Sequence, residues 1–295
     1  MVQTHSRIPG VAPARGGRLR HLARTRISEH PTLYLPVARR KYPGTRHLLL
    51  ARRNYPGTSP EVVSSETEVV IDGYTRCATT FAVFAFQLAQ ERPVRVAHHL
   101  HAPAQLIVAA KMGIPVLALI REPREAILSQ LIREPGISAR GALVAYARFY
   151  SSLMPYRSRM VVGQFDEVTQ SFGSVVRKLN NRFGTSFTEF EHNEANLRAC
   201  LDLVKERATP IPEWSTVVGR FESGLITRSD LRRARERLAH QQPSEPSGSR
   251  DIWLPSSERS QSKDRLREQW SQPDLMALRA RAQLAYDRFV AGIGA

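Results

Sequence analysis

Four short apolar runs in the middle of the chain alternate with longer stretches in which apolar residues recur at helical spacing. The apolar runs cover residues 68–73, 94–98, 115–120 and 159–163. Parallel strands need long crossover connections, which are usually helices, so this alternation is typical of a parallel sheet. The pattern predicts an α/β fold in three layers, with helices on both faces of a parallel sheet. A last amphipathic helix is predicted over residues 273–290 and is expected to dock on the core.

The first apolar run leads directly into a short loop and the start of an apolar helix, with the sequence VVIDGYTRCATTFAVF. The first N–H groups of a helix have no intrahelical acceptor and carry the positive end of the peptide dipoles, so this junction predicts an anion cradle. Gly73 allows a sharp turn, Arg76 supplies positive charge, and the hydroxyls of Thr79 and Thr80 can donate to anionic oxygens. The alternative is an ordinary strand-to-helix turn that is rich in threonine.

The segment 73–80 has the length of the phosphate loop of NTPases. Ala78 and Thr79, however, stand where that loop has its second glycine and its lysine. Without the lysine, an ATPase or kinase mechanism lacks its central cation. A nucleotide-dependent kinase is therefore kept only as an alternative.

A second candidate anion contact follows the third apolar run. That run ends in Arg121, which is followed by Glu122, Pro123 and a helix that carries Ser129. Proline in the first turn is a signal for the start of a helix. Doubly wound sheets bind ligands at the carboxyl ends of their strands, so Arg121 and Ser129 are expected to reach one anion.

Together the two segments resemble the sulfotransferases that use 3′-phosphoadenosine 5′-phosphosulfate (PAPS). Residues 73–80 read GYTRCATT beside the family pattern G-Y-P-[KR]-S-G-T-T, and residues 121–129 read REPREAILS beside R-[DE]-P-x-[DE]-x-x-x-S. The first segment departs from the pattern at Thr75, Cys77 and Ala78. The resemblance extends over residues 66–190 and implies a P-loop-like fold.

The resemblance implies an enzyme that moves a sulfonate group from PAPS to a hydroxyl or amine of a small molecule, lipid or carbohydrate, without a metal. The family's first segment grips the 5′-phosphosulfate and its second the 3′-phosphate. Arg76 would also act catalytically, by stabilising charge on the bridging oxygen. At the matching positions the resemblance implies cofactor contacts from Tyr74, Thr75, Arg76, Cys77, Ala78, Thr79, Thr80, Arg121 and Ser129.

Members of the family place a histidine base on the loop after the next strand, and this chain offers His98, His99 and His101 there. The register of the segment favours His99, with His101 as the close competitor. An imidazole with an unperturbed pKa of about 6.5 suits proton removal near neutral pH. The alternatives are a zinc site, which lacks a neighbouring Cys or acidic ligand in the sequence, and a purely structural role.

The family's C-terminal cofactor loop has no clear copy here. Residues 252–270 stand in its place, with Arg259 and Lys263 at helical spacing. We expect these two cations to contact the nucleotide, although a solvated basic helix is the alternative. The Ser-, Pro- and Gln-rich loop 241–262 is predicted to act as a lid over the cofactor.

The chain is strongly basic, with 43 Lys and Arg residues against 27 Asp and Glu and a formal net charge of +16. Such a charge attracts anions, including a phosphorylated cofactor or nucleic acid. Residues 1–62 are predicted to be a basic, partly disordered extension, and residues 63–295 a sulfotransferase-like domain. The extension holds the repeats ARRKYPGT and ARRNYPGT, which make a nucleic-acid-binding protein the non-enzymatic alternative.

Only two cysteines occur, Cys77 and Cys200, so no disulfide framework is expected. Cys77 lies at a predicted helix N-terminus beside Arg76, which predicts a lowered thiol pKa. No apolar run has the length of a membrane span. These features favour a bacterial cytoplasmic enzyme.

Overall fold

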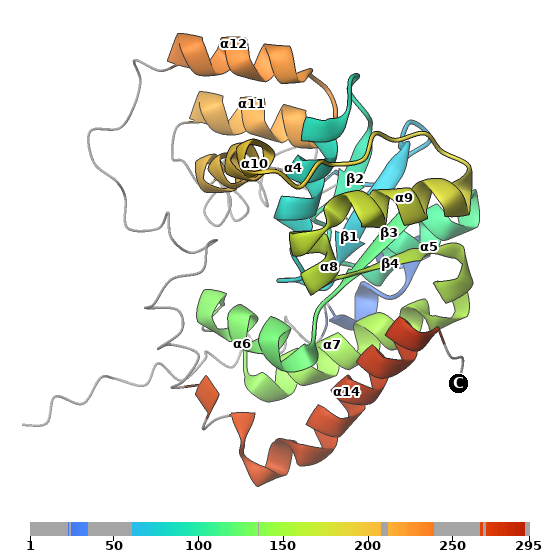
Figure 1. Ribbon diagram of the computed structural model, residues 1–295. Helices are drawn as coiled ribbons and strands as arrows, with labels where there is room; N and C mark the ends of the chain where they lie inside the picture. The colour runs from blue at the N-terminus through green and yellow to red at the C-terminus, as the bar shows by residue number, and fades with distance from the viewer. Residues whose placement is uncertain are drawn as a thin grey trace, which may run out of the picture.

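Four parallel strands form the central sheet of the computed structural model, in the order β2-β1-β3-β4 (Figure 1). The strands are β1 (Val69–Gly73), β2 (Val96–His98), β3 (Val116–Ile120) and β4 (Val161–Gln164). The structure describes residues 23, 25–34, 61–134, 136–207, 212–238, 266–267 and 270–292. Each strand lies within about two residues of a predicted apolar run, which confirms the predicted parallel α/β fold.

Helices cover both faces of the sheet (Figure 1). One face carries α4 (Thr79–Ala89), α8 (Phe165–Gln170) and α9 (Phe172–Phe183), and the other carries α5 (Pro103–Met112), α6 (Pro123–Arg133) and α7 (Ala139–Leu153), followed by η1 (Met154–Arg159). Beyond α4 lie α10 (Glu194–Glu206), α11 (Pro212–Glu222) and α12 (Arg228–Leu238). The predicted C-terminal helix is confirmed: η4 (Pro273–Leu275) leads into α14 (Met276–Ala291), which packs on α7.

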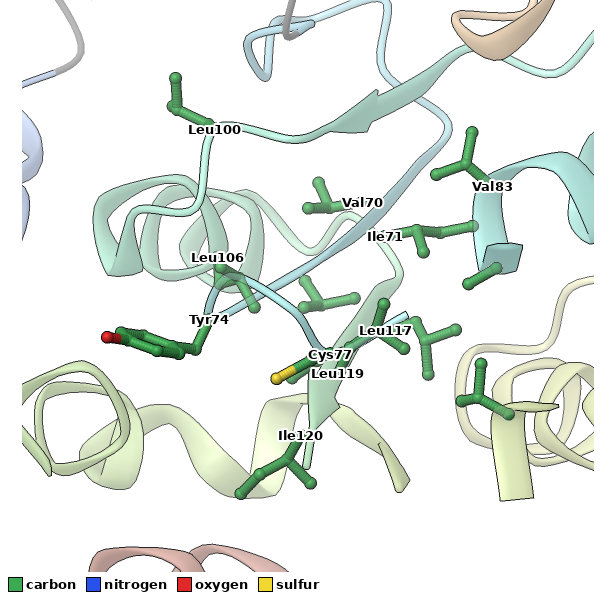
Figure 2. Packing of buried hydrophobic residues seen from close by; sticks show 14 of the residues in the cluster. Val70, Ile71, Tyr74, Cys77, Val83, Leu100, Leu106, Leu117, Leu119 and Ile120 are labelled. Atoms are coloured by element: carbon green, nitrogen blue, oxygen red, sulfur yellow. The ribbon is translucent and has the colours of Figure 1, made fainter. Parts of the chain in front are cut away.

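The hydrophobic core lies between the sheet and these helices. All residues of β1 and β3 are buried, because both faces of these inner strands are covered. Figure 2 shows Ile71 directed toward Val83 of α4, with Leu106 of α5 on the opposite side of β1. The continuous apolar runs in the sequence therefore reflect strands that are buried on both sides.

The strand order makes the ends of β1 and β3 neighbours. From β1 the chain crosses to β2 on one side and then returns past β1 to β3 on the other, so the direction of winding reverses between β1 and β3. Ligands of open α/β sheets bind at such a reversal, beyond the carboxyl ends of the strands. At this point Gly73 approaches β3 so closely that a Cβ there would lie 2.2 Å from the Leu119 carbonyl oxygen.

The helices after β4 begin and end with ordinary helix-terminal chemistry. The acidic pair Asp166 and Glu167 lies in the first turn of α8, where negative charge stabilises the helix. Helix α9 ends at Phe183, and Gly184 follows with a φ of 65°, a left-handed conformation that suits glycine.

Part of the predicted N-terminal extension is ordered against the α/β unit. In the segment 25–34, Glu29 forms an ion pair of 2.5 Å with Arg148 of α7, and the Ser28 carbonyl accepts a bond of 3.0 Å from the Ala104 N–H. The two basic repeats, the lid-like loop 241–262, Arg259 and Lys263 lie outside the described residues. Among the described helices, none is both long and apolar enough to cross a membrane.

Candidate active site

The loop between β1 and α4 has an unusual backbone. Arg76 has a φ of 69° and Ala78 a φ of 66°, while Cys77 between them has a negative φ. Residues that alternate in the sign of φ can turn successive N–H groups to the same side, which is the backbone pattern of a concave anion-binding nest. Residues other than glycine adopt positive φ at a cost, and such strain concentrates at functional sites.

The first turn of α4 adds further donors to this nest. Within the described part of the chain, the N–H groups of Thr79, Thr80 and Phe81 have no acceptor, and the N-cap Ala78 has no side-chain cap. The hydroxyl of Thr79 is likewise without a hydrogen-bond partner there, although Thr79 is only 4% exposed. An unpartnered buried donor is costly, so the Thr79 hydroxyl and these N–H groups make the first turn of α4 a candidate site for an acceptor of hydrogen bonds.

Replacing Ala78 with glycine is expected to raise the free energy of unfolding by about 0.5–1 kcal/mol. Glycine removes the strain of a side chain at a φ of 66°. The free energy gained by this relief is larger than the free energy lost because glycine has more conformational entropy in the unfolded chain. Ala85→Gly, in the middle of α4, is the matched control and should lower the free energy by about 1 kcal/mol or more. Denaturant unfolding measures both. A loss of stability in Ala78→Gly would contradict the left-handed backbone.

Two loop side chains point into the core rather than toward the nest. The Tyr74 hydroxyl donates to Gln130 Oε1 at 2.6 Å, and the Cys77 thiol lies 3.5 Å from the Tyr150 hydroxyl. Burial raises the pKa of Cys77 to about 11, so the predicted lowering of this pKa is wrong. The helix terminus and the neighbouring arginines do not offset the loss of water around the thiol. Both residues therefore anchor the loop through their side chains.

The two sequence segments meet at the carboxyl edge of the sheet. Arg76 Nε donates to Ser129 Oγ at 3.0 Å, which joins the loop to helix α6. Arg121 Nη1 donates to the Arg76 carbonyl oxygen at 3.4 Å, and the Arg121 guanidinium stacks 3.7 Å above the ring of Phe165. Burial lowers the pKa of Arg121. Two arginines and a buried serine therefore converge beside the nest.

The loop after β2, which carries the histidines, is held by Asp72, a fully buried carboxylate at the end of β1. Its Oδ2 accepts from the N–H groups of Leu100 and His101, both at 3.0 Å, and from Gln105 Nε2 at 3.1 Å. Its Oδ1 accepts from the Gly73 N–H at 2.9 Å. Asp72 therefore fixes the loop after β2 against the loop after β1.

Asp72 was not among the site residues predicted from the sequence. The available signal was a single acidic residue inside an otherwise apolar strand, since a buried carboxylate requires several donors.

His101 has a defined tautomer. Its Nδ1 lies 2.9 Å from the Gly73 carbonyl oxygen and 3.2 Å from Asp72 Oδ1. Both neighbours only accept hydrogen bonds, so Nδ1 carries the proton and Nε2 of the neutral ring carries a lone pair. Among the described residues, none forms a hydrogen bond with Nε2, and the side chain is 24% exposed. His101 thus presents a proton acceptor at the surface of the site.

His99 is held from both sides. Its Nε2 lies 3.0 Å from Thr80 Oγ1, and its Nδ1 lies 2.8 Å from Nδ1 of His98. His98 Nε2 in turn lies 3.3 Å from Ser223 Oγ, at the end of α11. His99 and His101 both have positive φ, 56° and 48°, so this second loop is also strained.

Burial keeps His98 and His99 uncharged. It lowers the pKa of His98 to about 3 and the pKa of His99 well below 6.5, and the Arg207 guanidinium lowers both further. Arg207 is itself buried and forms an ion pair of 2.6 Å with Glu222. Both rings are therefore neutral imidazoles near neutral pH.

The three histidines are near neighbours, with ring centroids 4.9 Å apart for His98 and His99 and 5.7 Å apart for His99 and His101. Even so, no group of three or more His, Cys, Asp or Glu side chains in the described residues is arranged to hold a metal ion. The ring nitrogens contact one another, two hydroxyl groups, the Gly73 carbonyl and the Asp72 carboxylate.

Two hollows in the surface lie away from this site. One, of about 420 Å³, is lined by Arg26, Ile27, His30 and Arg148. The other, of about 300 Å³, is lined by Ala110, Lys111, Gly113, Ile114, Arg159, Arg182 and Phe183. Neither is lined by a residue of the loop 73–80, of the segment 121–129 or of the histidine segment, so the loop and the histidines remain the candidate site.

Comparison with models of known protein families and with curated proteins gives no match to this chain. The chemistry of the site therefore has to be inferred from its geometry and from the two short motifs.

Proposed function

We propose that this chain is a P-loop-like sulfotransferase that transfers a sulfonate group from PAPS to a hydroxyl or amine acceptor. The observation that carries the proposal is the 3.0 Å contact between Arg76 Nε and Ser129 Oγ. This contact joins the two segments that resemble the 5′- and 3′-binding motifs, and a single bisphosphorylated nucleotide would need both segments close together. A kinase is less well supported, because threonine replaces the phosphate-loop lysine.

In this proposal the strained loop holds the 5′-phosphosulfate. The free N–H groups at the start of α4 and the hydroxyls of Thr79 and Thr80 donate to its oxygens, and Arg76 stabilises the charge that develops on the bridging oxygen. Arg121 and Ser129 hold the 3′-phosphate. Stacking on Phe165 restricts the Arg121 guanidinium before the ligand binds, which reduces the entropy lost on binding.

His101 is the proposed base. As the acceptor oxygen or nitrogen attacks sulfur, its proton passes to His101 Nε2, the bond between sulfur and the bridging oxygen breaks, and 3′-phosphoadenosine 5′-phosphate leaves. The Nδ1–H stays bonded to the Gly73 carbonyl and to Asp72, whose negative charge stabilises the imidazolium that forms. His99, favoured by sequence register, has both ring nitrogens engaged.

Calorimetric titration with 3′-phosphoadenosine 5′-phosphate, ATP with Mg²⁺ and single-stranded DNA tests the proposal. Binding of the first ligand is expected, and Arg121→Ala should weaken it about tenfold to a hundredfold, since a charge-assisted phosphate contact is lost. Arg124→Ala is the matched control, because Arg124 is exposed on the same helix. It should change the affinity by less than about threefold.

Other outcomes would assign the site differently. Binding of ATP alone, dependent on Mg²⁺, would favour a kinase. Binding of DNA alone, with an affinity that falls steeply with salt, would favour a nucleic-acid-binding protein. Equal effects of Arg121→Ala and Arg124→Ala would remove Arg121 from the nucleotide site.

A further inference from the structure

A continuous chain of side-chain hydrogen bonds runs from α11 to the anion-binding loop. Ser223 Oγ lies 3.3 Å from His98 Nε2, the two Nδ1 atoms of His98 and His99 lie 2.8 Å apart, and His99 Nε2 lies 3.0 Å from Thr80 Oγ1. His98 is fully buried and His99 partly buried. The chain ends on a hydroxyl that lies in the first turn of α4.

The short contact between the two Nδ1 atoms restricts this chain to two arrangements. A neutral imidazole carries one N–H, so one Nδ1 must donate and the other accept. If His99 Nδ1 donates, its Nε2 must accept the Thr80 hydroxyl proton, and Thr80 cannot donate elsewhere. If His98 Nδ1 donates, His99 carries its proton on Nε2 and donates it to Thr80 Oγ1. The Thr80 proton is then free to point away from His99.

We propose that His99 is a positioning residue of the anion site formed by the loop 73–80. In its Nε2–H tautomer it donates to Thr80 and directs the Thr80 hydroxyl proton to an oxygen of the bound sulfonate or phosphate. This inference rests on the proposed function for the identity of the anion. A bound anion only accepts hydrogen bonds, so it favours the arrangement in which Thr80 donates to it. His98 then donates from Nδ1 and accepts the Ser223 hydroxyl at Nε2.

This arrangement separates the tasks of the neighbouring histidines. His101 has an Nε2 with no hydrogen-bond partner in the described chain, and in the proposed reaction this atom takes the acceptor's proton. His99 has no free ring nitrogen and acts on the ligand only through Thr80. Asparagine is the suitable replacement for His99, because it tolerates the φ of 56° and keeps a polar group near Nδ1. It removes Nε2, the ring atom that contacts Thr80.

A double-mutant cycle tests the inference, with inorganic sulfate as the probe and 3′-phosphoadenosine 5′-phosphate as a second ligand. Thr80→Val and His99→Asn should each weaken binding about tenfold, and the double variant should be no weaker than Thr80→Val alone. His192→Asn, at an exposed histidine, should have no effect. If His99→Asn still weakens binding in the Thr80→Val background, or has no effect in the parent, the inference is wrong.

A second measurement needs no variant. In ¹⁵N-histidine NMR spectra of the full chain with saturating sulfate, His99 should be protonated at Nε2 and His98 at Nδ1. If the spectrum with bound sulfate shows His99 protonated at Nδ1 and His98 protonated at Nε2, the inference is wrong. If the effects of Thr80→Val and His99→Asn on sulfate affinity are coupled but the nucleotide does not bind, only the proposed function is overturned. Binding of neither ligand would overturn both.

Discussion

Replacing His101 with asparagine is expected to lower kcat for the proposed sulfonate transfer by about 10²–10⁴-fold, the usual contribution of a positioned general base. Asparagine tolerates the φ of 48° and offers an N–H close to the position of Nδ1, so the bond to the Gly73 carbonyl can be kept. The proton-accepting Nε2 is lost with the rest of the ring. The affinity for 3′-phosphoadenosine 5′-phosphate should change little, because His101 is not among the residues proposed to bind the nucleotide.

The measurement is transfer of labelled sulfonate from PAPS to a panel of phenols, alcohols, sugars and amines, followed by kinetics with an acceptor that the parent protein uses. His192→Asn is the matched control, since it makes the same change at an exposed histidine outside the site. His99→Asn should lower nucleotide affinity more than it lowers kcat. If His99→Asn abolishes turnover while His101→Asn retains it, the base is His99, as the sequence register favoured.

Replacing Arg207 with methionine is expected to lower the free energy of unfolding by about 3–5 kcal/mol. Arg207 and Glu222 have side chains that are 3% and 0% exposed, and Arg207 Nε donates to Glu222 Oε1 at 2.6 Å. Glu222 Oε2 already has no hydrogen-bond partner among the described residues. Without Arg207 the whole carboxylate would be left without an opposite charge in the core.

Arg235→Met provides the control for this prediction, because Arg235 pairs with Glu206 at 2.8 Å and is 49% exposed. An exposed pair should contribute at most about 1 kcal/mol. The double variant Arg207→Met, Glu222→Leu should recover most of the lost stability, since both charges of the buried pair are removed. Denaturant unfolding compares the four proteins. Equal losses in Arg207→Met and Arg235→Met would contradict the buried position of the first pair.

The pH dependence of this variant has a definite sign. Burial raises the pKa of Glu222 and Arg207 lowers it, so the pKa rises further when Arg207 is removed. A group whose folded pKa is raised binds a proton more tightly in the folded state, and stability relative to the parent therefore increases as pH falls. The deficit of Arg207→Met should shrink between pH 7 and pH 5.

Local signals predicted several features of this site correctly. The apolar run before Gly73 and the apolar run before Arg121 are both buried strands, and Pro123 does begin helix α6. These predictions succeed because an inner parallel strand is apolar on both faces and because proline fits the first turn of a helix. Neither signal depends on distant parts of the chain.

Other features could not be read from neighbouring residues. The lowered pKa expected for Cys77 assumed an exposed helix terminus, but the thiol is packed against Tyr150. The role of Asp72 depends on donors from the loop after β2, some 30 residues away in sequence. The choice between His99 and His101 depends on which ring nitrogen is already occupied, and sequence register does not contain that information.

The sequence by itself determined where the strands and helices of the central unit form and which two segments offer positive charge and hydroxyl groups. Tertiary structure alone decided that β1 and β3 are adjacent, which brings Arg76 to Ser129 and leaves the donors of α4 beside them. The physical reason is the distance along the sequence over which each kind of interaction acts. Strand and helix propensities act over a few residues, whereas strand order, burial and the direction of a hydrogen bond depend on groups that meet only after the chain has folded.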